Sequence, residues 1–463
     1  MLRHAPPSVE TVETVETAET QRWLPEQRYA AQRLIWLVDP IGAIPGEGLL
    51  PSRTWSIARA LVAAGHGVVW WTSGFSHTRK IPRNPPLHIF TEEGFRVRLI
   101  AARPYRGDFS LGRFASHRDF ARTFERVACE SVAAGQLERP DLVLATLPPP
   151  DSAEAAERIA RRLDAEFVVD VAEIWPETLQ PLIPGPAWLA AAARRILFPG
   201  IRRRCRLLLG RTNAVLAGSQ TTAARLSTVA PAAAVNVVPI GSYVQDYMPP
   251  RPLIDQVPPP GRNGRQPASQ AAPALAVAVA GDLDDRADLL SLVDLARALS
   301  RQQTPATLHV IGGGRWMPKL ISVAPLVKGS CRIVAHGMLD RSRYVARLAD
   351  CQVGLVLPGL LARLPLPAVA CDYAAAGLAV VLAGAGELAD LVQAAEAGVV
   401  VDAADADTLA AAIAGLATAT HTISRQRQAA RRLAETRLDR EQLASDLVTW
   451  LEALAAPAVS EAG

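Results

Sequence analysis

The sequence predicts an α/β protein built from two doubly wound parallel-sheet domains in tandem. Its 463 residues exceed the roughly 250–300 residues at which one hydrophobic core stops growing. Short apolar runs alternate with segments of helical period, which is typical of parallel sheets covered by helices. Aromatic residues make up only 5% of the chain, and an apolar fraction rich in aliphatic side chains and alanine suits such sheets.

The first domain is expected over residues 31–248. Its predicted strands are the apolar runs at 34–38, 68–72, 142–146 and 167–171. Between them lie predicted helices that start near Ser52 and that span about 115–134 and 152–163. Strands of about five residues separated by helices of about 10 to 15 residues indicate repeated βα units.

The pattern stops at residues 249–273, where prolines and polar residues predict a linker. It then restarts and predicts a second domain over 274–440, followed by a helix and tail over 441–463. The predicted strands of the second domain lie at 274–281, 307–314, 331–337, 353–359, 379–384 and 398–401. Two such domains facing each other bring the carboxyl ends of both sheets to one cleft, where α/β sheets bind ligands.

The composition excludes several classes of protein. A formal charge of only +4 argues against a dedicated nucleic-acid binder. Five widely spaced cysteines without a CxxC pair indicate neither a disulfide framework nor a zinc site, and they favour a reducing cytoplasm. No apolar run approaches the roughly 18 residues of a membrane-spanning helix. The Val-Glu-Thr repeat within residues 1–30 predicts a disordered acidic tail instead of an export signal.

The loop after the first predicted strand, PIGAIPGEGLLPSRTW, is a candidate phosphate site. Gly46 and Gly48 let a ligand approach the backbone closely, Ser52 is suited to cap the next helix, and Arg53 lies in the first turn of that helix. Exposed amides at a helix start bind phosphate or carboxylate groups. An ordinary turn explains the same residues equally well.

Two further glycine-containing segments give weaker evidence for a ligand site than this loop does. VIGGGRW at 310–316 lacks the spacing and the acidic partner of a dinucleotide fingerprint, and no GxxxxGK[ST] is present. GDLDD at 281–285 contains the DxD pattern of metal-dependent sugar transferases. Acids near the positive start of a helix are the favoured interpretation of that pattern, so we predict no metal site.

The segment ILFPGIRRRCRLLLGR at 196–211 interleaves arginines with apolar residues. Arginine stems lie along apolar surfaces while their charged ends stay in water, so the segment is suited to contact anionic lipid headgroups. A solvated helix face is an equally good interpretation. The arginines of this candidate membrane contact are Arg202, Arg203, Arg204 and Arg206.

The segment FVVDVAEIWPETL at 167–179 places acidic side chains at the end of a predicted strand. Glu173 and Glu177 lie on either side of Trp175. A carboxylate beside an indole is suited to a sugar, whose apolar face stacks on the ring and whose hydroxyls need acceptors. Capping of the next helix explains Glu177 at least as well.

Taken together, these motifs resemble family 4 of the retaining glycosyltransferases, over about residues 33–440. The matching stretches, in order, are PGEGLLPSRTWSIARALVAAGHGVVWWTSGFSH, PDLVLATLPPP, DVAEIWPETL and PLPAVACDYAAAGLAVV. The similarity is closest to the branch that builds bacterial surface polysaccharides, whose motifs include SSFSH, DLWP and PNKxFDYMAAGKP. The resemblance implies a GT-B fold, in which two Rossmann-like domains face each other across a cleft.

The resemblance also implies roles for individual residues. His77, in the stretch that matches SSFSH, is expected to contact the acceptor or the donor, although a histidine that ties two loops together fits equally well. Glu173 matches the aspartate of DLWP and is the other candidate catalytic residue. The expected contacts of the donor diphosphate are Gly46, Gly48 and Arg53. Asp372 is expected at the ribose hydroxyls, and Gly377 at the end of the same helix. Glu387 is expected near the donor sugar, and the backbone around His336 at the base.

Several positions depart from the family motifs. Ala368 and Val369 stand in place of the asparagine and lysine of PNK, and Leu364 stands where many members have the first glutamate of a pair. A leaving diphosphate needs its growing charge stabilised. Arg286, at the helix start after Gly281, is expected to substitute for the missing lysine, and Gly281 is itself an expected donor contact.

The family implies transfer of a sugar from a nucleotide-diphosphate donor to a lipid-linked or polysaccharide acceptor at the cytoplasmic face of the membrane. No metal or other cofactor is expected, and no nucleic acid is an expected partner. The departures from the motifs leave a second interpretation open. It is a glycosyltransferase-like protein without catalysis that serves as a binding or regulatory partner in polysaccharide assembly.

Overall fold

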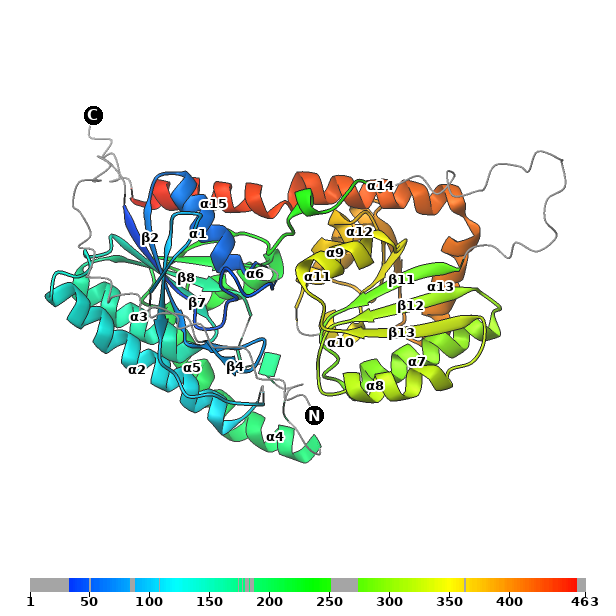
Figure 1. The fold of residues 1–463 in the computed structure, drawn as a ribbon, viewed down its shortest axis with the longest axis horizontal. Helices are drawn as coiled ribbons and strands as arrows, with labels where there is room; N and C mark the ends of the chain where they lie inside the picture. Colours follow the sequence, from blue (N-terminus) through cyan, green and yellow to red (C-terminus); the bar gives the residue numbers. More distant parts are fainter. Residues whose placement is uncertain are drawn as a thin grey trace, which may run out of the picture.

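The computed structural model describes residues 33–49, 51–83, 88–107, 109–173, 175–176, 178–179, 183, 187–250, 274–361 and 364–455. The predicted acidic tail at 1–30 lies outside the described residues, as does the predicted linker except for its first two residues. The described residues form two α/β domains, each with its own sheet (Figure 1).

The N-terminal domain is built on an eight-stranded sheet in which β5 runs antiparallel and the other strands run parallel. In sheet order the strands are β10 (Ala234–Val237), β9 (Ala214–Ala217), β8 (Glu166–Val171), β7 (Leu142–Leu147), β1 (Leu34–Val38), β2 (Gly67–Ser73), β6 (Arg96–Ile100) and β5 (His88–Phe90). The helices are α1 (Arg53–Ala63), α2 (Leu111–Ala133), α3 (Pro150–Leu163), α4 (Ala187–Ile196), α5 (Phe198–Leu209) and α6 (Gln220–Val229). A separate antiparallel ribbon pairs β3 (Phe75–Ser76) with β4 (Ile81–Pro82).

The C-terminal domain is built on a six-stranded parallel sheet. In sheet order its strands are β13 (Cys331–Gly337), β12 (Ala306–Ile311), β11 (Leu275–Ala280), β14 (Val353–Leu355), β15 (Ala379–Ala383) and β16 (Gly398–Val401). Its helices are α7 (Arg286–Arg301), α8 (Met317–Val323), α9 (Arg341–Ala349), α10 (Pro358–Leu361), α11 (Ala368–Ala375), α12 (Glu387–Ala394), α13 (Ala406–Thr418) and α14 (Thr420–Arg437), and the chain ends in α15 (Arg440–Ala455). Short 3₁₀ turns, η2 (Val244–Asp246) and η4 (Ala324–Leu326), complete the elements.

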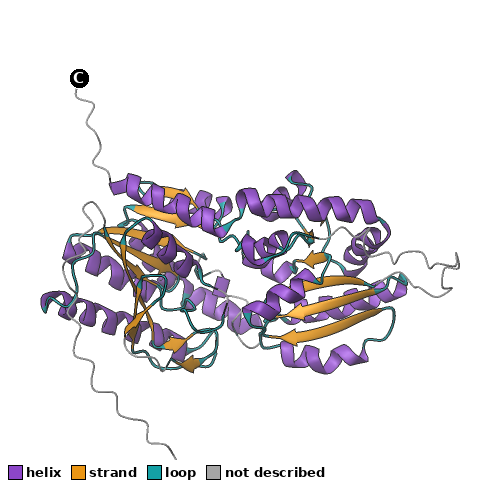
Figure 2. Ribbon diagram, turned by 45° about the horizontal axis from the view of Figure 1, so that its top comes forward, coloured by secondary structure: helices purple, strands orange, loops and turns teal. Residues whose placement is uncertain are grey.

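Both sheets have the strand order of a Rossmann fold, so the predicted pair of doubly wound α/β domains is confirmed. In each sheet the first strand, β1 or β11, lies inside the sheet, with the next strands on one side and the later strands on the other. Helices cover both faces of each sheet (Figure 2). The order reverses between β1 and β7 and between β11 and β14, and such reversal points are where α/β sheets bind ligands.

Burial on both faces explains why the strands are almost continuously apolar. Along β1, Ile35 and Leu37 pack into the core on one face of the sheet, while Trp36 and Val38 pack into the core on the other. All four side chains are at most 1% exposed. This two-sided core fixes the positions of the loops at the carboxyl ends of the strands.

The last two helices connect the domains in a way that we did not predict from the sequence. α14 packs against α11 of the C-terminal domain, whereas α15 returns to the N-terminal domain and packs against α1 (Figure 1). Leu447, Val448 and Leu451 of α15 belong to the same core as Ile35 and Leu37. The N-terminal domain is therefore made of two separate stretches of chain.

Candidate functional site

A cavity of about 640 Å³ lies between the two domains, and we refer to it as the interdomain cleft. Its volume falls within the roughly 300–1,000 Å³ of typical ligand sites. The N-terminal domain lines it with His77, Thr78, Lys80, Arg106, Gly107, Phe109, Arg113, Glu173, Trp175 and Leu179, and the C-terminal domain lines it with Asp282, Asp284, Gly313, Gly314, Arg315 and Met338.

The C-terminal wall of the cleft consists of two loops, after β11 and β12, that hold each other in place. The carboxylate of Asp282 accepts the backbone N–H of Gly313 at 2.8 Å, and that of Asp284 accepts the N–H of Arg315 at 3.2 Å. The DxD acids therefore order the facing glycine loop. Within the described ranges, no group of three or more His, Cys, Asp or Glu side chains is placed to hold a metal ion.

The same two loops approach each other so closely that only glycine fits. Gly312 has φ +145°, and a Cβ there would lie 2.1 Å from the carbonyl oxygen of Gly281. Gly314 has φ +94°, and a Cβ there would lie 2.5 Å from the backbone nitrogen of Leu283. Gly281 itself has φ +130°, so the expected donor contact at Gly281 belongs to this loop pair. The result is a wall of backbone that a ligand can approach.

The N-terminal wall of the cleft carries positive side chains. Ser110 caps α2 by accepting the backbone N–H of Arg113 at 3.1 Å. This cap places Arg113 in the first turn of α2, where its guanidinium carbon lies 5.4 Å from the centre of the Trp175 ring. Lys80 and Arg106 line the same wall. With Arg315 of the opposite wall, four cations line the cleft, and the carboxylates that line it are those of Glu173, Asp282 and Asp284.

Two histidines lie at this wall, His77 half-buried and His117 buried. His77 lines the cleft, and its Nδ1 is hydrogen-bonded to the hydroxyl of Tyr105. His117 of α2 packs edge-on against the Tyr105 ring. Burial, followed by the positive charge of Arg113, holds the pKa of His77 and the pKa of His117 well below the usual value. Both rings are therefore neutral at pH 7, and His77 is suited to hydrogen-bond a hydroxyl. The catalytic roles of His77 and of Glu173, which also lines the cleft, stay predictions.

The loop that contains Gly46 and Gly48 is held by a buried ion pair. Arg83 contacts the two carboxylate oxygens of Glu47 at 3.0 and 3.1 Å and donates to the carbonyl oxygen of Gly42 at 2.8 Å. Gly46 and Gly48 have φ +86° and +65°, a region that favours glycine. Neither belongs to the residues that line the cleft, so their contact with a diphosphate stays a prediction.

Arg53 is bound to groups of the N-terminal domain, and its contact with a donor diphosphate stays a prediction. Its Nε donates to Asp170 at 2.7 Å, and its Nη1 donates to the carbonyl oxygens of Val238 and Pro239 at 2.7 and 3.0 Å. The side chains of Arg53 and Asp170 are 11% and 1% exposed. Arg53 therefore fastens α1 to the end of β8 and to the segment that leaves the domain.

Asp372 is hydrogen-bonded within the protein, and its contact with ribose hydroxyls stays a prediction. One of its carboxylate oxygens accepts the Ser242 hydroxyl at 2.6 Å, and the other accepts the Tyr344 hydroxyl at 3.0 Å. Burial raises the pKa of Asp372, and these hydrogen bonds offset only part of that rise. Gly377 follows α11 at φ +64°, where a Cβ would lie 2.6 Å from Pro250. Gly377 ends the helix as expected, while its contact with a donor stays a prediction.

Glu387 contacts the other domain instead of an open site. Its carboxylate accepts the backbone N–H groups of Gln220 and Thr221 at 2.9 and 2.8 Å. These amides belong to the first turn of α6, so the acid at the start of α12 caps a helix of the N-terminal domain. In this structure Glu387 joins the domains, and its position near a donor sugar stays a prediction.

The two remaining donor candidates lie outside the cleft lining. His336 is hydrogen-bonded through Nε2 to Nδ1 of His309 at 3.0 Å, and the two rings stack. Arg286 is the first residue of α7 and is exposed. Arg315, and not Arg286, is the arginine that the C-terminal domain places in the cleft lining. Substitution of Arg286 for the missing lysine stays a prediction.

The candidate membrane arginines lie on α5, and their contact with a membrane stays a prediction. Arg204 forms ion pairs with Asp151 and Glu154 of α3 at 2.9 and 2.7 Å, so its guanidinium is held by the protein itself. Arg202, Arg203 and Arg206 are exposed. Among the helices that the structure describes, none is long and apolar enough to cross a membrane.

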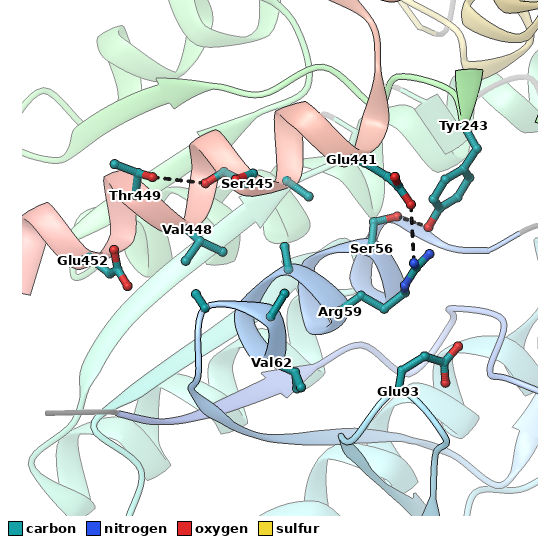
Figure 3. A pocket seen from close by; sticks show the side chains of 14 residues that line it. Ser56, Arg59, Val62, Glu93, Tyr243, Glu441, Ser445, Val448, Thr449 and Glu452 are labelled. Carbon is teal, nitrogen blue, oxygen red and sulfur yellow. Dashed lines mark hydrogen bonds and ion pairs between the residues drawn. The ribbon is translucent and has the colours of Figure 1, made fainter. Parts of the chain in front are cut away.

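A second large hollow, of about 620 Å³, lies on the N-terminal domain between α1 and α15. Figure 3 shows the Arg59–Glu441 ion pair at one end of it, and this pair closes at 3.4 Å. Its lining side chains come from α1, α15, Glu93 and Tyr243. Because no loop at the carboxyl end of either sheet contributes, the interdomain cleft is the better candidate for an active site.

Sequence reasoning missed most of the positive charge in the cleft. We did not predict that Lys80, three residues after His77, lines the cleft. Arg113 lies three residues after Ser110, which caps α2, whereas Arg53 directly follows Ser52, which caps α1. Arg315 follows the glycines of VIGGGRW. For Arg113 and Arg315, the signal was a cation close to a helix-capping serine or a glycine loop.

Comparisons with known proteins agree with this architecture. Residues 51–241 match the glycosyl transferase 4-like domain, and residues 275–419 match the glycosyl transferases group 1 domain. A search of curated proteins found no match.

Solved structures with a similar fold cover almost the whole chain. A sucrose-phosphate synthase from Thermosynechococcus elongatus superposes with a TM-score of 0.68 at 17% identity, covering 91% of this chain and 99% of the other. HepE from Anabaena, solved with UDP and glucose, gives a TM-score of 0.58 at 16% identity, covering 91% and 100%. WaaG, a glycosyltransferase involved in lipopolysaccharide biosynthesis, gives 0.56 at 13% identity, covering 90% and 99%. These structural similarities support the fold, and the two domain matches identify the class of enzyme. The chain is a glycosyltransferase of the GT-B fold, composed of a glycosyl transferase 4-like domain and a group 1 glycosyl transferase domain.

Proposed function

We propose that this glycosyltransferase moves a sugar from a nucleotide-diphosphate donor to a lipid-linked or polysaccharide acceptor, with retention of the anomeric configuration. The observation that carries the proposal is the set of cations that converge on one cavity at the carboxyl ends of both sheets. A diphosphate leaving group gains charge as it departs, and preorganised cations and backbone amides stabilise that charge. HepE, whose fold is similar, was also solved with UDP-glucose, which belongs to the proposed donor class.

The two walls suggest a division of work. Gly313 and Gly314 let a diphosphate approach the backbone beside Arg315, while Lys80 and Arg113 offer charge from the facing wall. In front-face displacement the departing phosphate helps to deprotonate the acceptor hydroxyl. In this scheme neutral His77 hydrogen-bonds a sugar hydroxyl, and the sugar contacts Trp175 and the carboxylate of Glu173, which line the cleft together. No metal takes part in this scheme.

The surface of α4 and α5 supports a peripheral position at the cytoplasmic face of the membrane. The apolar side chains of Trp188, Ile196 and Leu207 are 69%, 73% and 48% exposed. They lie on the same helix pair as the exposed arginines Arg203 and Arg206. Exposed apolar side chains interspersed with arginine fit an anionic lipid surface.

The donor proposal is tested with nucleotide sugars. Isothermal titration of UDP-, GDP- and ADP-sugars into the full chain, followed by donor hydrolysis assays, should reveal one preferred donor that is turned over. Arg315→Gln should weaken nucleotide-diphosphate binding by about ten- to hundredfold, because charge-assisted hydrogen bonds contribute about 1.5–3 kcal/mol. Lys319→Gln, an exposed position on α8 outside the cleft, serves as the control. Equal losses in both variants would remove Arg315 from the site.

A binding or regulatory role without catalysis is the second candidate. The observation that favours it is that Asp282 and Asp284 line the cleft on the side of the proposed diphosphate, where acids oppose a leaving anion. Binding of a nucleotide sugar without hydrolysis or transfer to any acceptor would support this role. Turnover that is lost in Arg315→Gln would contradict it.

A further inference from the structure

A smaller cavity of about 170 Å³ adjoins the cleft, between α5 and α6, and we refer to it as the side pocket. Glu173 and Trp175 line both cavities. The side pocket also reaches the carboxyl ends of β7 and β8, where Leu147 and Val171 form part of its lining. Because complete ligand sites usually measure roughly 300–1,000 Å³, the side pocket is suited to one part of a ligand whose remainder lies in the cleft.

Helical spacing explains how α5 lines this pocket. Arg202, Cys205, Arg206 and Leu209 recur at intervals of three and four residues, so they share one face of the helix. On the other side, Arg225 reaches the pocket from α6 together with the buried side chain of Leu226. The pocket therefore combines an apolar lining with three guanidinium groups that two different helices supply.

The arginines that line this pocket outnumber its carboxylates. The carboxylate that lines it is Glu173, against Arg202, Arg206 and Arg225. In the part of the chain that the structure describes, neither Arg206 nor Arg225 takes part in any of the ion pairs. Arg204, one position away from the pocket face, is in contrast held by two carboxylates. The guanidinium groups of Arg206 and Arg225 lie beside an apolar cavity. They fit an anion such as phosphate, because one guanidinium can bind two phosphate oxygens at once.

We propose that the side pocket binds the phosphate or diphosphate of a lipid-linked acceptor, with the first part of the apolar chain against Leu147, Val171 and Leu226. The acceptor sugar then extends past Trp175 and Glu173 into the cleft. This inference rests on the proposed function, and it selects the lipid-linked acceptor over the free polysaccharide. The exposed apolar surface of α4 and α5 places the same arginines beside the proposed membrane contact.

The test is isothermal titration of the full chain with farnesyl diphosphate, inorganic diphosphate and farnesol, in the presence of saturating UDP so that the donor site is filled. We expect farnesyl diphosphate to bind at least tenfold more tightly than either fragment. Arg206→Ala and Arg225→Ala should each weaken its binding about tenfold. Arg203→Ala, on α5 but outside the lining, should leave the affinity unchanged.

Val229→Thr tests the apolar part of the pocket, because it keeps the shape of a lining residue while adding a hydroxyl. It should weaken farnesyl diphosphate severalfold and leave inorganic diphosphate unaffected. Equal affinity of inorganic and farnesyl diphosphate would overturn the lipid assignment and indicate a site for free phosphate. Equal loss in Arg203→Ala and Arg206→Ala would overturn the pocket and indicate general attraction to the surface.

The proposed function is checked separately on the same protein samples. A nucleotide sugar that binds normally while farnesyl diphosphate binds no better than its fragments overturns the side pocket and leaves the glycosyltransferase proposal intact. Absence of nucleotide-sugar binding, together with tight and arginine-dependent farnesyl diphosphate binding, contradicts the donor proposal and supports the pocket. Thermal unfolding of each variant confirms that the exposed substitutions leave the fold unchanged.

Discussion

The two walls of the cleft differ in what they offer a ligand. The C-terminal wall offers backbone, because Gly312 and Gly314 let two loops meet at distances that no side chain permits. The N-terminal wall offers side chains, with Arg113 set in the first turn of a capped helix and His77 neutral behind it. The C-terminal wall therefore depends on the shape of its backbone, and the N-terminal wall depends on the charge of its side chains. We expect substitutions in the two walls to have different effects.

The largest effect is expected from breaking the backbone wall. Gly312→Ala drives a Cβ to within 2.1 Å of the carbonyl oxygen of Gly281, and we expect unfolding to become easier by at least about 3 kcal/mol. Gly384→Ala is the matched control, since it has φ +94° but open space around the new Cβ, and it should cost only about 1–2 kcal/mol. Urea denaturation measures both. Similar losses would mean that the close approach of the loops is not what requires glycine.

The next effect comes from removing charge from the other wall. Arg113→Gln should lower kcat/KM for the preferred donor by about ten- to hundredfold, equivalent to about 1.5–3 kcal/mol. The control is Arg122→Gln, an exposed arginine farther along α2, which should retain full activity. A variant at Arg113 that keeps its kcat/KM would contradict the assignment of charge to this wall.

The neutral histidines predict a dependence of stability on pH. The pKa of His117 is lowered in the folded protein, so the unfolded chain takes up a proton near its ordinary pKa of about 6.5 while the folded chain does not. Stability is therefore complete above pH 6.5 and is lost as the pH falls, by up to about 1.4 kcal/mol per pH unit for each such histidine.

His117→Phe should flatten this slope between pH 6.5 and 5.5. Neither ring nitrogen of His117 has a hydrogen-bond partner in the structure, so the substitution should cost little or even stabilise the protein at pH 7.5. Urea denaturation of both proteins at the three pH values measures the difference. Parallel slopes would show that another group titrates.

The smallest effect is expected at the contact between Glu387 and the start of α6, which joins the two domains. Glu387→Gln removes a charge from the start of α6, and we expect a loss of about 0.5–1 kcal/mol. Small-angle scattering should show a larger spread of domain arrangements. Asp390→Asn, on an exposed position of α12, should change neither measurement.

Much of the fold was predictable, because strands buried on two faces leave long apolar runs. β1, predicted at 34–38, lies at Leu34–Val38, and α1 begins directly after Ser52, which accepts the N–H of Trp55. The short strands β9 and β10, the strand β6 and the edge strand β5 beside it were not predicted. The apolar residues of β10 are interrupted by Asn236, and none of its residues is buried, so it lacks the run that identified the others.

The site was less predictable, because local patterns do not reveal which cation a distant acid will bind. Arg53 and Arg113 both follow a serine cap by one to three residues. Asp170, more than a hundred residues away, holds Arg53 inside the fold, while Arg113 lines the cleft. Likewise, the arginines of α5 look alike in sequence, and only the acids of α3 separate Arg204 from Arg206. Partners of this kind are set by topology.

The passage of the chain between the domains limits how the protein can move. The outgoing segment at Ser242 and the returning segment at Asp439 pair with each other, and the N–H of Arg440 donates to the carbonyl oxygen of Ser242 at 2.9 Å. The two connections between the domains that the structure describes therefore lie side by side at this pairing. We therefore expect the two domains to open and close by rotation about one axis at this pairing, with little sliding or twisting of one domain against the other. A chain cut before residue 440 would lose the hinge and, with α15, part of the first domain's own interior.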